Sequence, residues 1–206
     1  SIDPQHAAVA LAEQRKHEES LGLDETINEL GDIIHSMDEG AKRTAEIVRG
    51  LRHFSRLDED DLKPSDINEG LRSTLAVLAP QYRDKVDLIL DLGELPKVEC
   101  FAGKINQVMM NILNNAAQAT LARMDGRIRR VTATTSTNGD RAIIRIADTG
   151  VGMSDDIKAR IFDPFFTTKP VGEGTGLGLA IGYGIINEHQ GTIAGDSLPG
   201  EGTTFT

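Results

Sequence analysis

Apolar and small residues recur every three or four positions through the first quarter of the chain, among residues that are mostly polar or charged. This alternation is the heptad pattern of a helix that packs lengthwise against other helices. The row consists of Ile27, Leu30, Ile34, Met37, Ala41, Thr44, Val48, Leu51 and Ser55. The pattern therefore predicts one long amphipathic helix that begins near Asp24.

A helix of ~30 residues is ~45 Å long, which is longer than a small domain needs. Residues 5–20 have the pattern of a further helix, and residues 21–23 that of the turn between the two. We therefore expect a partial helical hairpin at residues 1–56 that forms a homodimer by pairing into a four-helix bundle. An amphipathic helix packed on its own domain is the alternative.

After an acidic linker at residues 57–66, the chain mixes helical and strand periods. Helices are predicted at residues 68–78, 102–121 and 176–188, and strands at residues 86–92, 127–137, 141–147, 192–197 and 203–206. Asn138-Gly139-Asp140 is a hairpin turn signal between two of these strands. This mixture predicts an α+β fold for residues 67–206, an α/β sandwich with helices on one face of the sheet.

Composition and charge narrow the classes of function. Of the 206 residues, 39% are apolar and 26% charged, as in soluble globular proteins. The net charge is −10, of which residues 1–66 contribute −8 and residues 67–206 only −2. This acidity argues against nucleic acid or an anionic membrane as a partner, and no apolar run reaches the ~18 residues of a membrane span. We expect a cytoplasmic segment of a longer protein, whether or not that parent protein is membrane-anchored.

Two segments of the body carry polar side chains that suit a ligand. Asn111 and Asn115 are four residues apart and share one face of a predicted helix, where amide oxygens could bind a hard cation such as Mg²⁺. A polar surface stripe explains that spacing equally well. Asp148 follows a predicted strand and precedes Gly150 and Gly152, so a flat ligand could approach the backbone while the carboxylate accepts a hydrogen bond from an exocyclic amine. A tight turn capped by Asp148 is the alternative.

Two further segments suggest a mobile, phosphate-binding loop. Phe162, Phe165 and Phe166 account for three of the six phenylalanines and fall within five positions, which suggests a packing anchor. Alternating glycines at residues 174–178 open a predicted helix and can point backbone N–H groups at phosphate oxygens. The chain contains no P-loop sequence, and these glycines lack the βαβ context of a dinucleotide-binding fold.

Taken in order, these segments resemble the N, G1, F, G2 and G3 boxes of the ATP-binding domain of sensor histidine kinases. The matching residues are Asn111, Asn115 and Ala116; Asp148, Gly150 and Gly152; Phe162, Pro164 and Phe165; Gly174, Gly176 and Gly178; and Gly202, Thr203, Thr204 and Phe205. Residues 47–56 resemble the end of the second helix of that family's dimerisation and phosphotransfer hairpin. Residues 115–119 are similar to the nitrogen-regulator type of sensor kinase. The resemblance implies a Bergerat-type (GHKL) α/β sandwich.

The resemblance also implies ATP and Mg²⁺ as cofactors and a role for each matching residue. Asp148 is expected to hold the adenine amine, with Gly150, Gly152 and Thr203 nearby. Asn111 and Asn115 are expected to meet the phosphates and the metal, Asn115 as the metal ligand, and Lys169 to contact the γ-phosphate. The lid backbone that faces the phosphates is expected to come from Gly174, Thr175, Gly176, Leu177 and Gly178.

One residue distinguishes between the relatives of this fold. The ATP-hydrolysing members, such as gyrase and the heat-shock chaperones, carry a Glu general base where this chain has Asn111. An amide takes no proton at neutral pH, so we expect ATP binding with slow hydrolysis. The implied activity is transfer of the γ-phosphoryl group to a histidine, for relay to an aspartate of a response regulator. An ATPase of the gyrase and chaperone type and a non-enzymatic, dimeric nucleotide-binding module are the alternatives.

The phosphate-accepting histidine of the family lies in a His-Glu-x-x-x-Pro sequence that this chain lacks. The histidines present are His6, His17, His35, His53 and His189. We expect none of them to be the acceptor, and His189 to lie at a helix end, where an imidazole interacts favourably with the helix dipole. The acceptor is expected upstream of residue 1 or on another chain.

Overall fold

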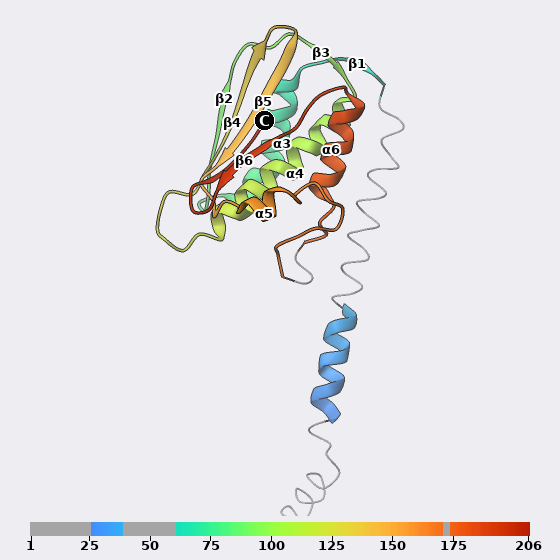
Figure 1. Ribbon diagram of the computed structural model, residues 1–206, viewed down its shortest axis with the longest axis vertical. Helices are drawn as coiled ribbons and strands as arrows, with labels where there is room; N and C mark the ends of the chain where they lie inside the picture. Colours follow the sequence, from blue (N-terminus) through green and yellow to red (C-terminus); the bar gives the residue numbers. More distant parts are fainter. Residues whose placement is uncertain (1–25, 39–60, 171–173) are drawn as a thin grey trace, which may run out of the picture. The chain divides into compact units, whose positions relative to one another are not determined.

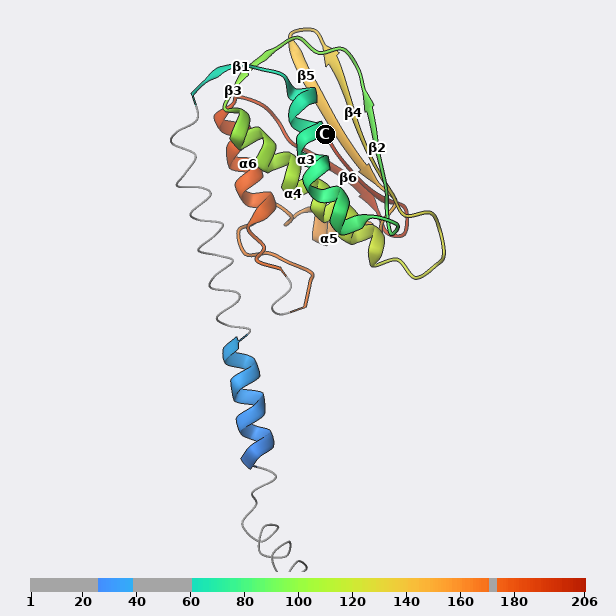
Figure 2. The same cartoon turned by 180° about the vertical axis from the view of Figure 1, so that it is seen from behind.

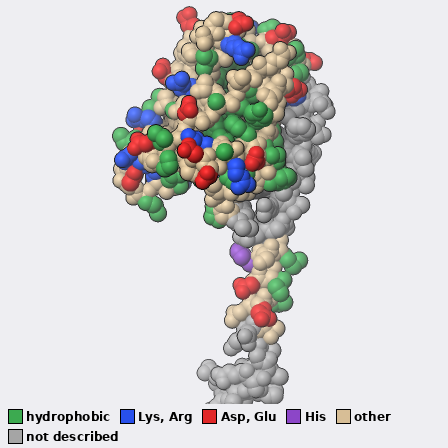
Figure 3. Space-filling model, in the orientation of Figure 1, with side chains coloured by type: hydrophobic (Ala, Val, Ile, Leu, Met, Phe, Trp, Pro, Cys, Tyr) green, Lys and Arg blue, Asp and Glu red, His purple; other side chains and the backbone are tan. Residues whose placement is uncertain are grey.

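The computed structural model describes residues 26–38, 61–170 and 174–206 (Figure 1). The chain divides into two compact units, residues 1–49 and 50–206, and each is described by itself. In the first unit residues 26–38 are helical, as predicted, and Ile27, Leu30, Ile34 and Met37 are all exposed. Figure 3 shows hydrophobic side chains along one side of this helix and acidic side chains with a histidine on the other. The rest of the predicted hairpin lies outside the described residues.

The second unit is built on a five-stranded sheet with the strand order β2-β4-β5-β7-β6. Its strands are β2 (Asp87–Leu92), β4 (Arg130–Asn138), β5 (Arg141–Asp148), β6 (Gly195–Leu198) and β7 (Gly202–Phe205). Strands β2 and β4 are parallel, and the other neighbours are antiparallel. The predicted hairpin of β4 and β5 is confirmed, with Asn138 opposite Arg141.

Three helices cover one face of this sheet, so the predicted α/β sandwich is confirmed (Figures 1 and 2). They are α3 (Ile67–Tyr82), α4 (Ala102–Leu121) and α6 (Gly178–Glu188), and a short helix α5 (Asp155–Lys158) precedes α6. Alternate residues of β4 face these helices, because Val131, Ala133 and Thr135 are buried while their neighbours are only partly so. None of the described helices combines the length and the apolar character needed to cross a bilayer.

The structure corrects the predicted linker at residues 57–66. Its last part forms strand β1 (Lys63–Ser65), which pairs antiparallel with β3 (Val98–Cys100), and neither strand was predicted. Asp66 is the N-cap of α3, where its side chain accepts a hydrogen bond of 3.0 Å from the backbone N–H of Glu69. The linker prediction was wrong here because strands of three residues are too short to show a period.

Helix α3 runs four residues past its predicted end. Pro80 lies inside the last turn, where a proline removes a backbone donor and usually ends a helix. The helix continues because Tyr82 is buried and its hydroxyl donates to Asn114 Oδ1 on α4. A tertiary contact thus outweighs the local preference of the proline.

Three other predicted boundaries shift for local reasons. Strand β4 starts at Arg130 and not at residue 127, because the Asp125 carboxylate accepts the Arg127 N–H at 3.2 Å and holds the preceding residues in a turn. Helix α6 starts at Gly178 and not at residue 176, because Gly176 has a left-handed φ of 64°. Strand β6 starts at Gly195 and not at residue 192, after the turn that ends α6.

Helix α4 lies at the centre of the hydrophobic core. Its buried face packs on α3 on one side and on the sheet on the other, with Leu71 of α3 and Val131 of β4 fully buried. Leu113 of α4 is 1% exposed. Burial of this face fixes the rotation of α4 about its axis, and therefore decides which of its side chains can face a ligand.

We predict that Leu113→Ala lowers the free energy of unfolding by about 2–5 kcal/mol, because it leaves a cavity in a packed core. Urea denaturation followed by circular dichroism measures this loss. Met124→Ala is the matched control, because Met124 is 94% exposed and its truncation should change stability by less than about 0.5 kcal/mol. Equal effects of the two substitutions would contradict the packing described here.

Candidate nucleotide-binding site

One face of α4 carries residues at successive four-residue steps that each touch a different part of the predicted site. Asn111 Nδ2 donates to the Gly178 carbonyl at 3.1 Å, at the start of α6. Asn115 Oδ1 lies 3.4 Å from Lys169 Nζ. A Cβ atom on Gly150 would lie 2.7 Å from the Ala119 backbone, so the turn after β5 packs directly on α4. The i, i+4 spacing of a helix thus brings the N box, the lid and the G1 turn together.

The Lys169 side chain extends from the loop after α5 to residues 115 and 118 of α4. Its ammonium donates to Gln118 Oε1 as well as to Asn115 Oδ1. Gln118 was not predicted as a site residue, and the structure makes it a partner of Lys169. A cation held beside two amide oxygens is a suitable environment for a phosphate group or for a metal bound to one.

The Asp148 carboxyl group lies at the end of β5 and is only 8% exposed. Its Oδ1 atom accepts the backbone N–H groups of Gly150 at 2.7 Å and Thr203 at 3.3 Å. Burial raises the pKa of Asp148 to about 6, and these two hydrogen bonds and the positive charge of Arg123 oppose that rise. The group is therefore mainly ionised at neutral pH, and its Oδ2 atom remains as an acceptor for a ligand.

The turns beside Asp148 require glycine. Gly152 has a φ of 67°, and a Cβ atom there would lie 1.9 Å from the Leu198 carbonyl oxygen. Gly202 has a φ of 100°, and a Cβ atom there would lie 2.0 Å from the Asp148 carbonyl oxygen. At both positions φ lies in the left-handed region, and another part of the backbone comes close to the α-carbon. No residue other than glycine tolerates this combination.

Ser197 on β6 joins these two turns and was not predicted as a site residue. Its hydroxyl donates to the Gly202 carbonyl and accepts the Met153 N–H, both at 2.8 Å, and it lies 2.9 Å from Thr203 Oγ1. A single serine in a short strand gives no sequence signal for such a role, because the partners are 44 and 6 residues away.

The described part of the glycine-rich lid packs on the phenylalanine loop and on α4. Gly176 accepts the Phe165 N–H at 2.9 Å, and a Cβ atom on Gly176 would lie 2.4 Å from the Phe165 carbonyl carbon. A Cβ atom on Gly174 would lie 3.1 Å from Lys169 Cδ. Leu177 is the N-cap of α6 and has no side-chain cap, while its N–H lies 3.4 Å from Thr175 Oγ1. The start of α6 thus offers backbone donors beside Asn111, Asn115 and Lys169.

The structure therefore gathers the predicted residues in two groups beside one face of α4. Asn111, Asn115, Lys169 and the lid lie beside residues 111–118 of α4, and Asp148, Gly150, Gly152 and Thr203 form a second group beside Ala119. Residues 26–38, 61–170 and 174–206 contain no group of three or more His, Cys, Asp and Glu side chains that could hold a metal ion. The side-chain oxygens beside the Lys169 ammonium are those of the amides Asn115 and Gln118.

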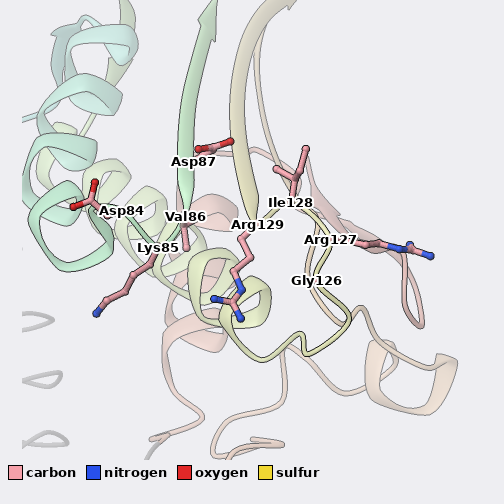
Figure 4. Close-up of a pocket in the computed structure, with 8 residues that line it drawn as sticks. All are labelled: Asp84, Lys85, Val86, Asp87, Gly126, Arg127, Ile128 and Arg129. Atoms are coloured by element: carbon pink, nitrogen blue, oxygen red, sulfur yellow. The ribbon is translucent and has the colours of Figure 1, made fainter.

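A separate groove lies where the chain enters β2 and β4, and it includes none of the predicted residues. It has a volume of about 540 Å³ and is lined by residues 84–87 and 126–129 (Figure 4). Lys85, Arg127 and Arg129 point in different directions in it, and Asp84 and Asp87 lie apart from one another (Figure 4). The charged groups do not converge, so this groove is not the nucleotide site.

Comparison with known proteins agrees with this geometry. The model of the "Histidine kinase-, DNA gyrase B-, and HSP90-like ATPase" family matches residues 102–206. AtoS of Escherichia coli, a signal transduction histidine-protein kinase, is 40% identical over 162 residues, which are 78% of this chain and 26% of AtoS. The sensor kinase CckA of Brucella abortus is 36% identical over 185 residues, which are 84% of this chain and 19% of CckA. The chain thus spans about a quarter or less of the length of these two relatives.

Solved structures give the same result for the fold. Full-length ShkA in complex with AMPPNP aligns with a TM-score of 0.67 and 30% identity over 81% of this chain and 35% of ShkA. The catalytic domain of the histidine kinase ThkA, in a nucleotide-free form, aligns with a TM-score of 0.61 and 28% identity over 70% of this chain and 92% of that domain. The chain therefore belongs to the histidine kinase-, DNA gyrase B- and HSP90-like ATPase family, and within it to the sensor histidine kinases.

We predict that Asp148→Asn weakens ATP binding about 10- to 100-fold. The side chain must accept two backbone N–H groups on one atom and an amine on the other, and an amide has only one accepting atom, so one donor stays unpaired. Isothermal titration calorimetry with a non-hydrolysable ATP analogue measures the change. Asp196→Asn, at an exposed position of β6, is the matched control. Affinity within threefold of the unsubstituted chain would exclude Asp148 from the base contact.

Proposed function

We propose that this chain binds Mg-ATP and transfers the γ-phosphoryl group to a histidine, from which the group passes to an aspartate of a response regulator. The observation that carries the proposal is the amide at position 111. Asn111 lies beside the start of α6, with its Nδ2 atom bound to the Gly178 carbonyl. In the hydrolysing relatives of this fold the corresponding side chain is a carboxylate that activates water. An amide cannot take that proton, so the phosphoryl group is kept for another nucleophile.

The residues gathered beside α4 fit the nucleotide in their chemistry. Asp148 Oδ2 would accept the exocyclic amine of adenine, and the Gly150, Gly152 and Thr203 backbone would lie against the base. Asn115 would bind Mg²⁺ through its amide oxygen, since that cation prefers oxygen ligands, with Asn111 beside the phosphates. ATP supplies the phosphoryl group that is transferred.

The group beside residues 111–118 of α4 also has the positive charge that a polyanion needs. Lys169 would leave Gln118 and Asn115 to contact the γ-phosphate, because a charge-assisted bond to phosphate is stronger than a bond to a neutral amide. The N–H groups from Gly174 to Gly178 would close over the phosphates, aided by the dipole of α6. ShkA, whose structure was solved with AMPPNP, supports the choice of an adenine nucleotide.

The surroundings of His189 support an acceptor that lies elsewhere. His189 is the C-cap of α6, as predicted. Its Nδ1 atom lies 2.7 Å from the Ile185 carbonyl oxygen, and its Nε2 atom accepts the Phe101 N–H at 3.1 Å. Both ring nitrogens are therefore engaged, and neither is free to attack a phosphoryl group. His6, His17 and His53 lie outside the described residues.

The proposal includes a helical part at residues 1–56 and a catalytic domain at residues 67–206. The exposed apolar row of Ile27, Leu30, Ile34 and Met37 supports a homodimer formed through that helical part, because such a row is stable in water only when another helix covers it. We further propose a cytoplasmic location, where ATP and response regulators are available.

We predict that the purified chain hydrolyses ATP at less than about 0.1 s⁻¹, a hundredth of the median turnover of enzymes. A phosphate-release assay measures this rate, with Asp148→Asn as the background control. Turnover near 10 s⁻¹ in the unsubstituted chain, abolished in that control, would favour the ATPase of the gyrase and chaperone type over the kinase.

We predict that labelled γ-phosphate from ATP appears on an added histidine kinase hairpin that contains its acceptor histidine, and not on this chain alone. Asn115→Ala should lower the rate of transfer at least about 10-fold, because it removes the metal ligand. Asn187→Ala is the matched control at an exposed position of α6. Tight ATP binding without transfer to hairpins from AtoS, CckA or ShkA would favour the regulatory nucleotide-binding module.

A further inference from the structure

Arg123 lies two residues beyond the end of α4 and is buried, with only 6% of its surface exposed. Burying a guanidinium group is costly unless its charge is paired and its N–H groups are satisfied. In this chain each of the three guanidinium nitrogens of Arg123 donates at least one hydrogen bond, and the accepting groups come from three separate segments. Neither the sequence nor the comparisons assign this residue a role.

One side of the guanidinium group forms a forked pair with the Asp125 carboxylate. Arg123 Nε lies 3.0 Å from Asp125 Oδ1, and Nη2 lies 2.6 Å from Oδ2. This pair lowers the pKa of Asp125 to about 2 and raises that of Arg123. The Asp125 side chain is 45% exposed, so its carboxylate lies between the buried guanidinium group and the solvent.

The remaining N–H groups bind backbone carbonyls of two turns. Nη1 donates to Thr149 at 2.6 Å and to Gly150 at 3.1 Å, and Nη2 donates to Gly200 at 2.9 Å. The two turns also bind each other, because the Gly200 N–H donates to the Val151 carbonyl at 2.7 Å. Arg123 therefore ties the turn after β5 to the turn between β6 and β7 and to the end of α4.

Gly150 connects this pairing to the base-binding carboxyl group. Its carbonyl accepts from Arg123, while its N–H donates to Asp148 Oδ1. Thr203, the other donor to Oδ1, follows the Gly200 turn that Arg123 also holds. The guanidinium group thus fixes both backbone donors of Asp148 from behind without itself facing the ligand.

We propose that Arg123 is the positioning residue of the base-binding end of the site. It holds the Gly150 and Gly200 turns in register, so that Asp148 Oδ2 points at the adenine amine. This inference rests on the proposed nucleotide site, and its readouts in the ligand-free chain are independent of that site.

The first experiment measures amide hydrogen exchange in the ligand-free chain. Arg123→Met keeps the length of the side chain but removes its donors, so the Gly150 and Thr203 N–H groups should exchange at least about 10-fold faster. Arg127→Met is the matched control, because Arg127 lies on the same loop with 60% of its side chain exposed. Unchanged protection of both amides in Arg123→Met would overturn the proposal.

The second experiment measures the affinity for a non-hydrolysable ATP analogue and for Mg-tripolyphosphate, which lacks the base. Arg123→Met should weaken the ATP analogue about 10- to 100-fold and leave the affinity for tripolyphosphate within about threefold. Asp125→Asn keeps the three carbonyl bonds and should cost less than about fivefold. Equal losses for both ligands would show a general structural role and overturn the proposal. If the unsubstituted chain binds no ATP, the proposed function fails, and the exchange experiment still decides the role of Arg123.

The third readout is the titration of Asp148, followed by carbon NMR of its carboxyl group. Among the described residues Arg123 is the charged group that acts on Asp148, and Asp125 and Glu201 act in turn on Arg123. Removing this positive charge disfavours the anionic form of Asp148, so Arg123→Met should raise the pKa of Asp148 above its value of about 6.

Arg123→Lys keeps the positive charge but not the forked pair with Asp125. It should therefore leave the pKa of Asp148 nearly unchanged, while the backbone N–H groups of Gly150 and Thr203 still lose protection from exchange. A pKa that falls in Arg123→Met would contradict the assignment. If Arg123→Met does not fold, Arg123→Lys alone carries the exchange test.

Discussion

The site depends on the rotation of α4 about its own axis. Its apolar face is buried between α3 and the sheet, and this burial leaves a partly exposed face whose residues follow at four-residue steps. Asn111 meets the start of α6, Asn115 meets Lys169, and Ala119 meets the G1 turn. A rotation of α4 by one residue would move all three contacts together. The core and the binding site are therefore two faces of one helix.

The two groups of residues beside this face differ in their chemistry. The group beside residues 111–118 of α4 offers amides, backbone N–H groups and the Lys169 ammonium, within residues 67–206, whose net charge is only −2. The group beside Ala119 holds the buried Asp148 carboxyl group, whose pKa is raised to about 6 by burial, while the hydrogen bonds of Gly150 and Thr203 and the nearby Arg123 charge oppose that rise. One group of the proposed site is therefore built from a buried carboxyl group and its backbone hydrogen bonds, and the other from amides and a cation.

Much of the fold could be predicted from the sequence, and the errors have local physical causes. The helix at residues 102–121 was predicted with the bounds it has in the structure, because 20 residues show its period clearly. Strands β1 and β3 were missed, because three residues show no period. The end of α3 was predicted four residues too early, at residue 78 and not at Tyr82, because Tyr82 contacts Asn114, 32 residues away, and a local pattern cannot show this contact.

The sequence by itself determined which residues are candidates for the chemistry, because Asn111 offers an amide, Asp148 a carboxylate and Gly176 a glycine backbone, and each lies in a motif of fixed spacing. Only the tertiary structure decided how Gln118, Ser197 and Arg123 take part. Their side chains are ordinary polar groups in sequence, and they bind Lys169, Met153 and Gly200, which lie 51, 44 and 77 residues away along the chain. Local spacing fixes the chemistry of a site, whereas burial and long-range hydrogen bonds fix its geometry.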